Sequence, residues 1–184
     1  MFKKTLVAGI VAISALSATS VLAAQQNSIR FKGSVSAQTC NISVNNSTSA
    51  EPVILLETAK VSDLAAAGNT STPTKFSIKL TGCADPGTAG QDIQVHFVSN
   101  NVDASGNLKN ISTDDKPANN VSIQLLDPDN KVINLSTGEA FAKAFKLNSG
   151  ETGGEAQYTA QYIATGAATA GNVEASVQYA INYL

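Results

Sequence analysis

The chain has 184 residues, with 12 basic and 14 acidic side chains and a formal net charge of −2. This weakly acidic balance, spread along the chain, excludes the basic stripe that nucleic-acid binding requires. Trp is absent and Met occurs once. Small and polar residues dominate the sequence, as in a β-protein with one solvated face.

The first 23 residues predict a secretory signal peptide. A basic start (MFKK) precedes a mostly apolar stretch over residues 5–18, and small residues follow up to Ala24. The alternative is a transmembrane anchor, but the apolar run is about 13 residues and a membrane span needs about 20. We expect cleavage after Ala23, with Ala24 as the alternative. The mature chain then keeps 10 basic and 14 acidic residues, because both leader lysines are lost, and it is not inserted in a membrane.

The mature chain holds two cysteines, Cys40 and Cys83. An even count in an exported protein predicts one disulfide. Its loop of about 43 positions corresponds to roughly 4 kcal/mol in the chain-entropy description. A metal site is the alternative, but His96 is the single histidine of the sequence and no Cys-x-x-Cys spacing occurs. We therefore expect no metal and no cofactor.

Alternating apolar residues predict strands rather than helices. We expect them over residues 29–44, 53–56, 75–80, 93–98, 121–126, 131–135, 158–164 and 173–184. Residues 127–130 (DPDN) predict a hairpin turn. We expect short irregular links at 58–67 and 139–147. Many short strands without a long helix predict one antiparallel sandwich domain.

Two amphipathic strands lie at the ends of the mature chain. In the last one the odd positions are apolar and most even positions are polar; the odd positions are Val173, Ala175, Val177, Tyr179, Ile181 and Tyr183. At the start, four positions alternate with polar residues: Ile29, Phe31, Gly33 and Val35. Alternation alone is equally typical of ordinary edge strands in a closed sandwich.

These segments together resemble the major subunits of chaperone–usher fimbriae, the type 1-like pilins. IRFKGSV at 29–35, with Cys40 after it, resembles the opening pattern of that family, and LTGC ending at Cys83 resembles its second-cysteine motif. VSIQLLD at 121–127, YTAQY at 158–162 and the penultimate aromatic Tyr183 are also similar. The resemblance covers residues 24–184.

The resemblance implies an immunoglobulin-like sandwich that lacks its final strand and is left with an apolar groove. A periplasmic pilus chaperone fills the groove first, and at an outer-membrane usher the N-terminal extension of another copy replaces it. The implied organisation is a donor-strand extension at 24–36 followed by a pilin domain at 37–184. The partners are then further copies in a homopolymer, the chaperone, the usher, and tip adhesin or adaptor subunits of a surface fimbria.

The resemblance also implies the site residues. The donor strand would insert Ile29, Phe31 and Val35, with Gly33 passing where a side chain does not fit. The groove wall and chaperone contact would come from the last strand: Val173, Val177, Tyr179, Ile181 and Tyr183.

Two other functions compete with that of a fibre subunit. An enzyme is disfavoured, because His96 lies in an alternating stretch and the acidic pairs at 114–115 and 127/129 lie in turn-like sequence. A minor or adaptor pilin, or an adhesin that binds a host glycan, is the stronger alternative. We expect no separate receptor-binding domain, because the pilin pattern begins directly after the leader.

Overall fold

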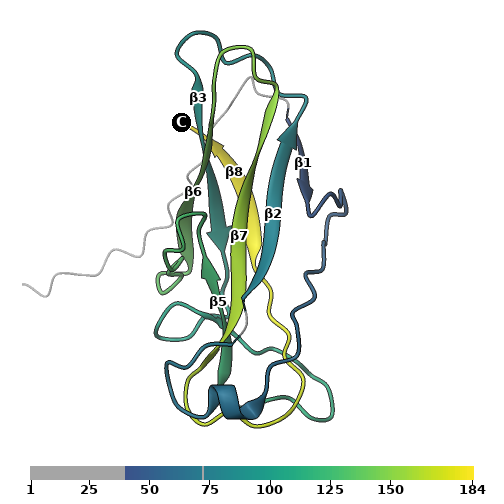
Figure 1. The fold of residues 1–184 in the computed structure, drawn as a ribbon, viewed down its shortest axis with the longest axis vertical. Coiled ribbons are helices and arrows are strands. Elements are labelled where there is room, and N and C mark those ends of the chain that lie inside the picture. The colour runs from purple at the N-terminus through teal and green to yellow at the C-terminus, as the bar shows by residue number, and fades with distance from the viewer. Residues whose placement is uncertain (1–39, 72) are drawn as a thin grey trace, which may run out of the picture. The chain divides into compact units, whose positions relative to one another are not determined.

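The computed structural model describes residues 40–71 and 73–184 (Figure 1). The predicted signal peptide at 1–23 and the predicted donor segment at 29–35 lie outside the described residues. All described residues belong to one unit of the chain, the sandwich.

Eight strands and one short 3₁₀ helix form the described part of the chain (Figure 1). The larger sheet is antiparallel, in the spatial order β1 (Asn41–Val44), β2 (Thr74–Thr81), β7 (Gly153–Ala164), β5 (Val121–Leu126) and β4 (Leu108–Lys109). The smaller sheet has the order β6 (Glu139–Leu147), β3 (Gln91–Val98) and β8 (Gln178–Tyr183). The 3₁₀ helix η1 spans Val61–Leu64. The predicted all-β, immunoglobulin-like sandwich is confirmed.

The core lies between the two sheets. Alternate residues of β2 and β3 are buried and the residues between them are not, because successive side chains of a strand point to opposite faces. Tyr158 of β7 is fully buried, and its ring lies against Phe97 edge-on and against Phe76 with ring centroids 5.6 Å apart. Aromatic contacts between β2, β3 and β7 thus join the sheets.

Most predicted strands are present. The strands expected at 75–80, 93–98, 121–126 and 158–164 fall within β2, β3, β5 and β7. The hairpin turn at 127–130 is also confirmed, since Asp127 N–H donates to Lys131 O and Asn130 has a φ of 60°. The link expected at 58–67 contains only the single turn of η1.

Two assignments were wrong. Residues 139–147, expected as an irregular link, form the nine-residue strand β6. A bulge shifts the register of its partner β3 between Asp92 and Gln94, and the exposure pattern of β6 breaks its alternation at 144–145, which hid the strand signal. Residues 131–135 form no strand beyond an isolated bridge of Val132 to Leu126, because Leu135 N–H donates to Gly106 O and does not continue the pairing with β5.

Two further predicted strands are extended but are paired only in part or not at all. Residues 53–56 belong to no ladder, and of the strand expected at 173–184 only Gln178–Tyr183 is paired. Both segments still alternate between half-buried and exposed residues. They lie on the same side of the sandwich and form the candidate site.

Candidate functional site

One edge of the last segment is hydrogen-bonded and the other is open. Leu184 N–H donates to Asp92 O at 3.0 Å, and the β3–β8 register places the even-numbered residues of β8 in the hydrogen-bonded positions. The same parity continues below the strand, where the backbone groups of Asn172 and Glu174 bond to the loop at 110–118. The N–H and C=O groups of the odd-numbered residues therefore point away from β3. Within the described residues none of these groups, from Val173 to Tyr183, has a hydrogen-bond partner.

The side chains of the same odd-numbered residues face the core but are only partly covered. They pack against the main core cluster or the smaller cluster beside the disulfide, and each remains half-buried: Val173, Ala175, Val177, Tyr179, Ile181 and Tyr183. In a closed sandwich such residues would be buried by the next strand. This strand therefore has an apolar face and a backbone edge that are both incomplete.

Residues 52–59 form a second incomplete wall. Ile54 and Leu56 are half-buried against the main core, whereas the intervening Val53 and Leu55 are 80% and 84% exposed. No backbone group of residues 52–59 is hydrogen-bonded to another described residue. The segment is thus an extended chain whose neighbour is missing.

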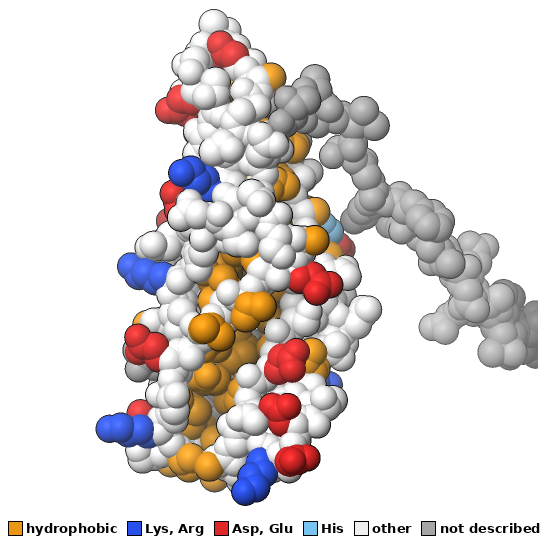
Figure 2. Space-filling view, turned by 90° about the vertical axis from the view of Figure 1, so that its right-hand side faces the viewer, with side chains coloured by type: hydrophobic (Ala, Val, Ile, Leu, Met, Phe, Trp, Pro, Cys, Tyr) orange, Lys and Arg blue, Asp and Glu red, His pale blue; other side chains and the backbone are white. Residues whose placement is uncertain are grey.

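The two walls border one apolar groove. Figure 2 shows an elongated hollow lined with hydrophobic side chains, with acidic side chains along one long border. At one end Ile42, Ile181 and Tyr183 pack together beside the disulfide, and at the other end Ala59 and Val173 pack on the cluster around Leu64. We call this hollow, between residues 52–59 and 173–183, the apolar groove.

The groove ends in a cavity of about 560 Å³ near η1. Ala59 and Leu64 line it from one wall and Val173 from the other, with Val121 and Tyr162 between them. Burial raises the pKa of Tyr162, and it raises the pKa of Tyr183 at the opposite end of the groove. Both phenols are therefore neutral at physiological pH and act as apolar walls with a polar tip.

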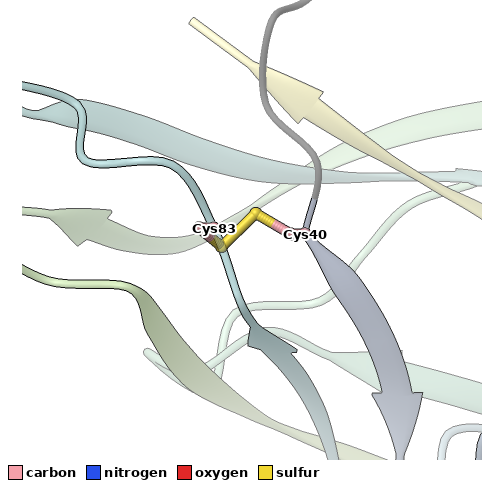
Figure 3. The surroundings of a disulfide bond; sticks show 2 residues. All are labelled: Cys40 and Cys83. Carbon is pink, nitrogen blue, oxygen red and sulfur yellow. A yellow bond between two sulfur atoms is a disulfide. The ribbon is translucent and has the colours of Figure 1, made fainter.

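The disulfide between Cys40 and Cys83 (Figure 3) lies at the other end of the groove, since Cys83 belongs to the cluster that Cys40, Ile181 and Tyr183 pack against. It joins the residue before β1 to the chain just after β2, with a sequence separation of 43. The predicted pairing is confirmed. It fixes the point at which the chain enters the sandwich.

The structure brings together the residues predicted for the groove wall. Val173 and Val177 precede β8, and Tyr179, Ile181 and Tyr183 lie in it; the five side chains share one half-buried face beside the groove. Sequence reasoning missed the cavity near η1 and the opposite wall at 52–59, where it expected a paired strand. The unbroken apolar run at 53–56 was the available signal, since a run with apolar residues on both faces is unusual for a strand with one solvated face.

His96 has a structural environment. It lies in β3, and its Nε2 atom is 2.7 Å from Glu139 Oε2 while its ring stacks on Phe141 at 4.1 Å. Among the residues that the structure describes, no cluster of His, Cys, Asp or Glu has the arrangement of a metal site. Within the same residues no helix has the length and apolar character to cross a bilayer.

The geometry of the groove favours the binding of an extended chain. Unpaired N–H and C=O groups beside uncovered apolar side chains are an unstable arrangement in water. A strand with apolar residues at alternate positions would satisfy the backbone groups and fill the hollow at the same time.

Comparisons with known proteins agree with this arrangement. The family model described as "Fimbrial protein" matches residues 29–184. The F17 fimbrial protein of Escherichia coli is 36% identical over 144 residues, which is 76% of this chain and 76% of that protein.

Solved structures show the same fold. The P pilus rod subunit PapA has a TM-score of 0.57 at 19% identity, over 78% of this chain and 99% of that one. A type I fimbria protein of Burkholderia pseudomallei has a TM-score of 0.55 at 21% identity, over 79% and 99%. The predicted resemblance to pilins is confirmed. The chain belongs to the fimbrial protein family and is a subunit of surface fimbriae.

Proposed function

We propose that this chain is the shaft subunit of a chaperone–usher fimbria and that its copies join by donor-strand exchange. Residues 29–35 of one copy enter the apolar groove of another. Each subunit is thereby completed by its neighbour, and the fibre supports adhesion at the cell surface.

The observation that carries this proposal is the open edge from Val173 to Tyr183 opposite the unpaired segment 52–59. A closed sandwich also has edge strands, but it covers the inward side chains beside them, whereas those of residues 173–183 are only half-buried. One inserted strand between the two walls would pair with both, because each presents free backbone groups.

The N-terminal segment has the chemistry of the missing strand. Ile29, Phe31 and Val35 present one apolar face, and burying each such side chain contributes about 1.5–3 kcal/mol before any backbone hydrogen bond is counted. Arg30 and Lys32 lie at the intervening positions and carry positive charge.

The charges of the groove complement those of this segment. Asp114 and Glu174 line the cavity near η1, and Figure 2 shows further acidic side chains along one border of the hollow. Complementary charge of this kind favours the encounter of the right partner and its register more than the final affinity.

The groove also explains the need for other partners. An uncovered apolar groove is prone to aggregation before assembly. We propose that a periplasmic chaperone covers it by the same strand addition, with the face of Val177, Tyr179 and Ile181 as its contact, until exchange occurs at an outer-membrane usher. Tip adhesin or adaptor subunits would dock through the same groove.

Phe31→Asp tests this proposal in cells that lack the chromosomal copy of the gene. A carboxylate cannot enter an apolar groove without a desolvation cost of several kcal/mol, so we expect cells that make the variant to carry no fibres. The measurement is electron microscopy of the cell surface, with wild-type complementation for comparison.

Ser34→Asp is the matched control, because it adds the same charge to the same segment at a position on the polar face. We expect it to form fibres. Fibres of normal yield from Phe31→Asp would refute donor-strand exchange by this segment. Fibres of normal length on cells that lack the gene altogether would refute the shaft role and indicate an adhesin or a minor subunit.

A further inference from the structure

Asn110 makes more side-chain hydrogen bonds than any other residue bordering the groove wall. Its Nδ2 atom donates to Ala118 O at 2.8 Å and to Asn172 O at 2.9 Å. Its Oδ1 atom accepts from Ser112 N and from Glu174 N, each at 3.0 Å. The amide thereby uses both of its donors and both lone pairs of its oxygen.

These bonds occur where the groove wall has lost its sheet. β3 ends at Val98, which pairs with Gln178, so β3 gives residues 172–174 no partner strand. The loop at 110–118 takes its place: Ile111 N–H donates to Glu174 O at 2.8 Å. Asn110 completes the replacement, because its side chain bonds the carbonyl of residue 172 and the N–H of residue 174.

The residue between these two anchors is Val173. Its side chain lines the cavity near η1, and its own backbone groups face the open edge. A clamp on residues 172 and 174 therefore sets the direction of the backbone groups of Val173 and the shape of the cavity wall. Asn172 is held in turn, since its side chain donates to Asp114 Oδ2 at 2.9 Å.

We propose that Asn110 is a positioning residue for strand docking: it holds residues 172–174 in the extended form that an incoming strand pairs with. This inference rests on the proposed function of the groove. Preorganisation raises affinity because the ordering cost of the segment is met before the strand arrives. Asn110 thus acts on the acceptor role of a subunit and leaves its donor role untouched.

The test compares Asn110→Asp with Asn134→Asp in the full chain purified from the periplasm. Asp keeps the acceptor oxygens but loses the two donors and turns a carboxylate toward the carbonyls of Ala118 and Asn172. Asn134 is a suitable control, because in the described structure its side chain only accepts, from Ser136 N at 2.8 Å, and lies at the surface. The probe is a fluorescent peptide of residues 24–36.

We expect Asn110→Asp to bind the peptide about tenfold or more weakly than wild type, the effect of losing two hydrogen bonds of ordinary strength. Asn134→Asp should bind like wild type. If wild type itself does not bind the peptide, the proposed function fails. If wild type and Asn110→Asp bind equally, only the role of Asn110 fails.

A mixing experiment separates the acceptor role of the subunit from its donor role. Phe31→Asp offers a groove but no functional donor, and Asn110→Asp offers a donor but a weakened groove. When the two variants are mixed, Asn110→Asp should donate its strand to the groove of Phe31→Asp as fast as the wild-type chain does. Failure of Asn110→Asp to donate would overturn the proposal. Because an unfolded chain could still offer residues 24–36, as the free peptide does, a cooperative urea-unfolding transition is the check that Asn110→Asp keeps its fold. Absence of that transition would also overturn the proposal. Should Asn110→Asp not accumulate, Asn110→Ser replaces it, because a hydroxyl can still accept from Ser112 N but is too short to reach residues 172 and 174.

Discussion

Tyr158 is the largest fully buried side chain among the described residues. Because its phenol can ionise, its burial makes the stability of the fold depend on pH. Its hydroxyl donates to Lys143 O at 3.2 Å. Burial raises the pKa of Tyr158 far above its ordinary value of about 10, and the charge of Asp127 adds to the effect. The folded chain therefore keeps this proton under conditions in which the unfolded chain releases it.

We predict that the free energy of unfolding falls as the pH rises above about 10. Below that pH the phenol is neutral in both states and the stabilisation is complete; above it only the unfolded chain ionises, at up to about 1.4 kcal/mol per pH unit for one proton. Tyr158→Phe removes this proton, so its urea-unfolding midpoint should decline less steeply from about pH 10 to about pH 11.5. Equal slopes for the two proteins would contradict the assignment, since Tyr162 and Tyr183 remain in both.

The disulfide also acts at the scale of single residues. Cys40 and Cys83 close a loop of 43 positions that contains β1, η1 and β2. In the chain-entropy description this contributes roughly 4 kcal/mol, a large part of the roughly 5–15 kcal/mol typical of a domain. It suits a sandwich with an open side, because it limits the unfolded chain without needing further core.

At the scale of elements, the two walls of the groove lack the neighbours that an interior strand has. β2 has neighbours on both sides, β1 and β7, whereas within the described chain residues 52–59 have none and residues 173–183 are bonded along one edge only. Backbone amides without partners exchange with solvent rapidly. The alternation along the last strand makes this difference measurable residue by residue.

We predict a parity pattern in amide hydrogen exchange. In the lone chain the odd-numbered amides from 179 to 183 should exchange rapidly and the even-numbered amides slowly, because only the latter bond to β3. Addition of the peptide 24–36 should protect the odd-numbered amides and those along 52–59 that face it. The amides of β7, which is paired on both sides, serve as the reference. Protection that spreads evenly over the sandwich would argue against strand addition.

At the scale of the whole molecule, the proposed function implies that a stable unit consists of one sandwich and one strand inserted from another copy. β8 ends at Tyr183, next to the C-terminal residue Leu184. A strand added after Leu184 through a short hairpin turn would run back along the open edge. The same chain would then supply both groove and strand.

We predict that appending residues 24–36 after Leu184 yields a monomer with a higher melting temperature. The appended strand competes at a millimolar or higher effective concentration, so it should exclude strands from other copies. Size-exclusion chromatography and thermal unfolding measure the two effects. Phe31→Asp in the appended copy is the control, and it should restore polymerisation. A fused chain that polymerises like wild type would contradict the proposed groove.

Much of this architecture was already legible in the amino-acid order. The alternation at 75–80, 93–98 and 121–126 predicted strands because a period of two leaves one face buried, whatever the neighbours are. The even cysteine count predicted the disulfide, and the odd positions of the last strand predicted a single apolar face. These signals are local, and local signals survive in any sandwich.

Tertiary structure alone decided which edges are paired. Residues 53–56 and 173–177 read as strands, but pairing depends on whether another chain lies beside them, and hydrophobic pattern does not record a missing neighbour. β6 was missed because a bulge between β3 and β6 breaks the alternation. The Asn110 clamp joins residues about 60 positions apart in the sequence. The alternation in the sequence predicts that one face of the last strand is apolar. Only the folded sandwich shows that this face is left uncovered.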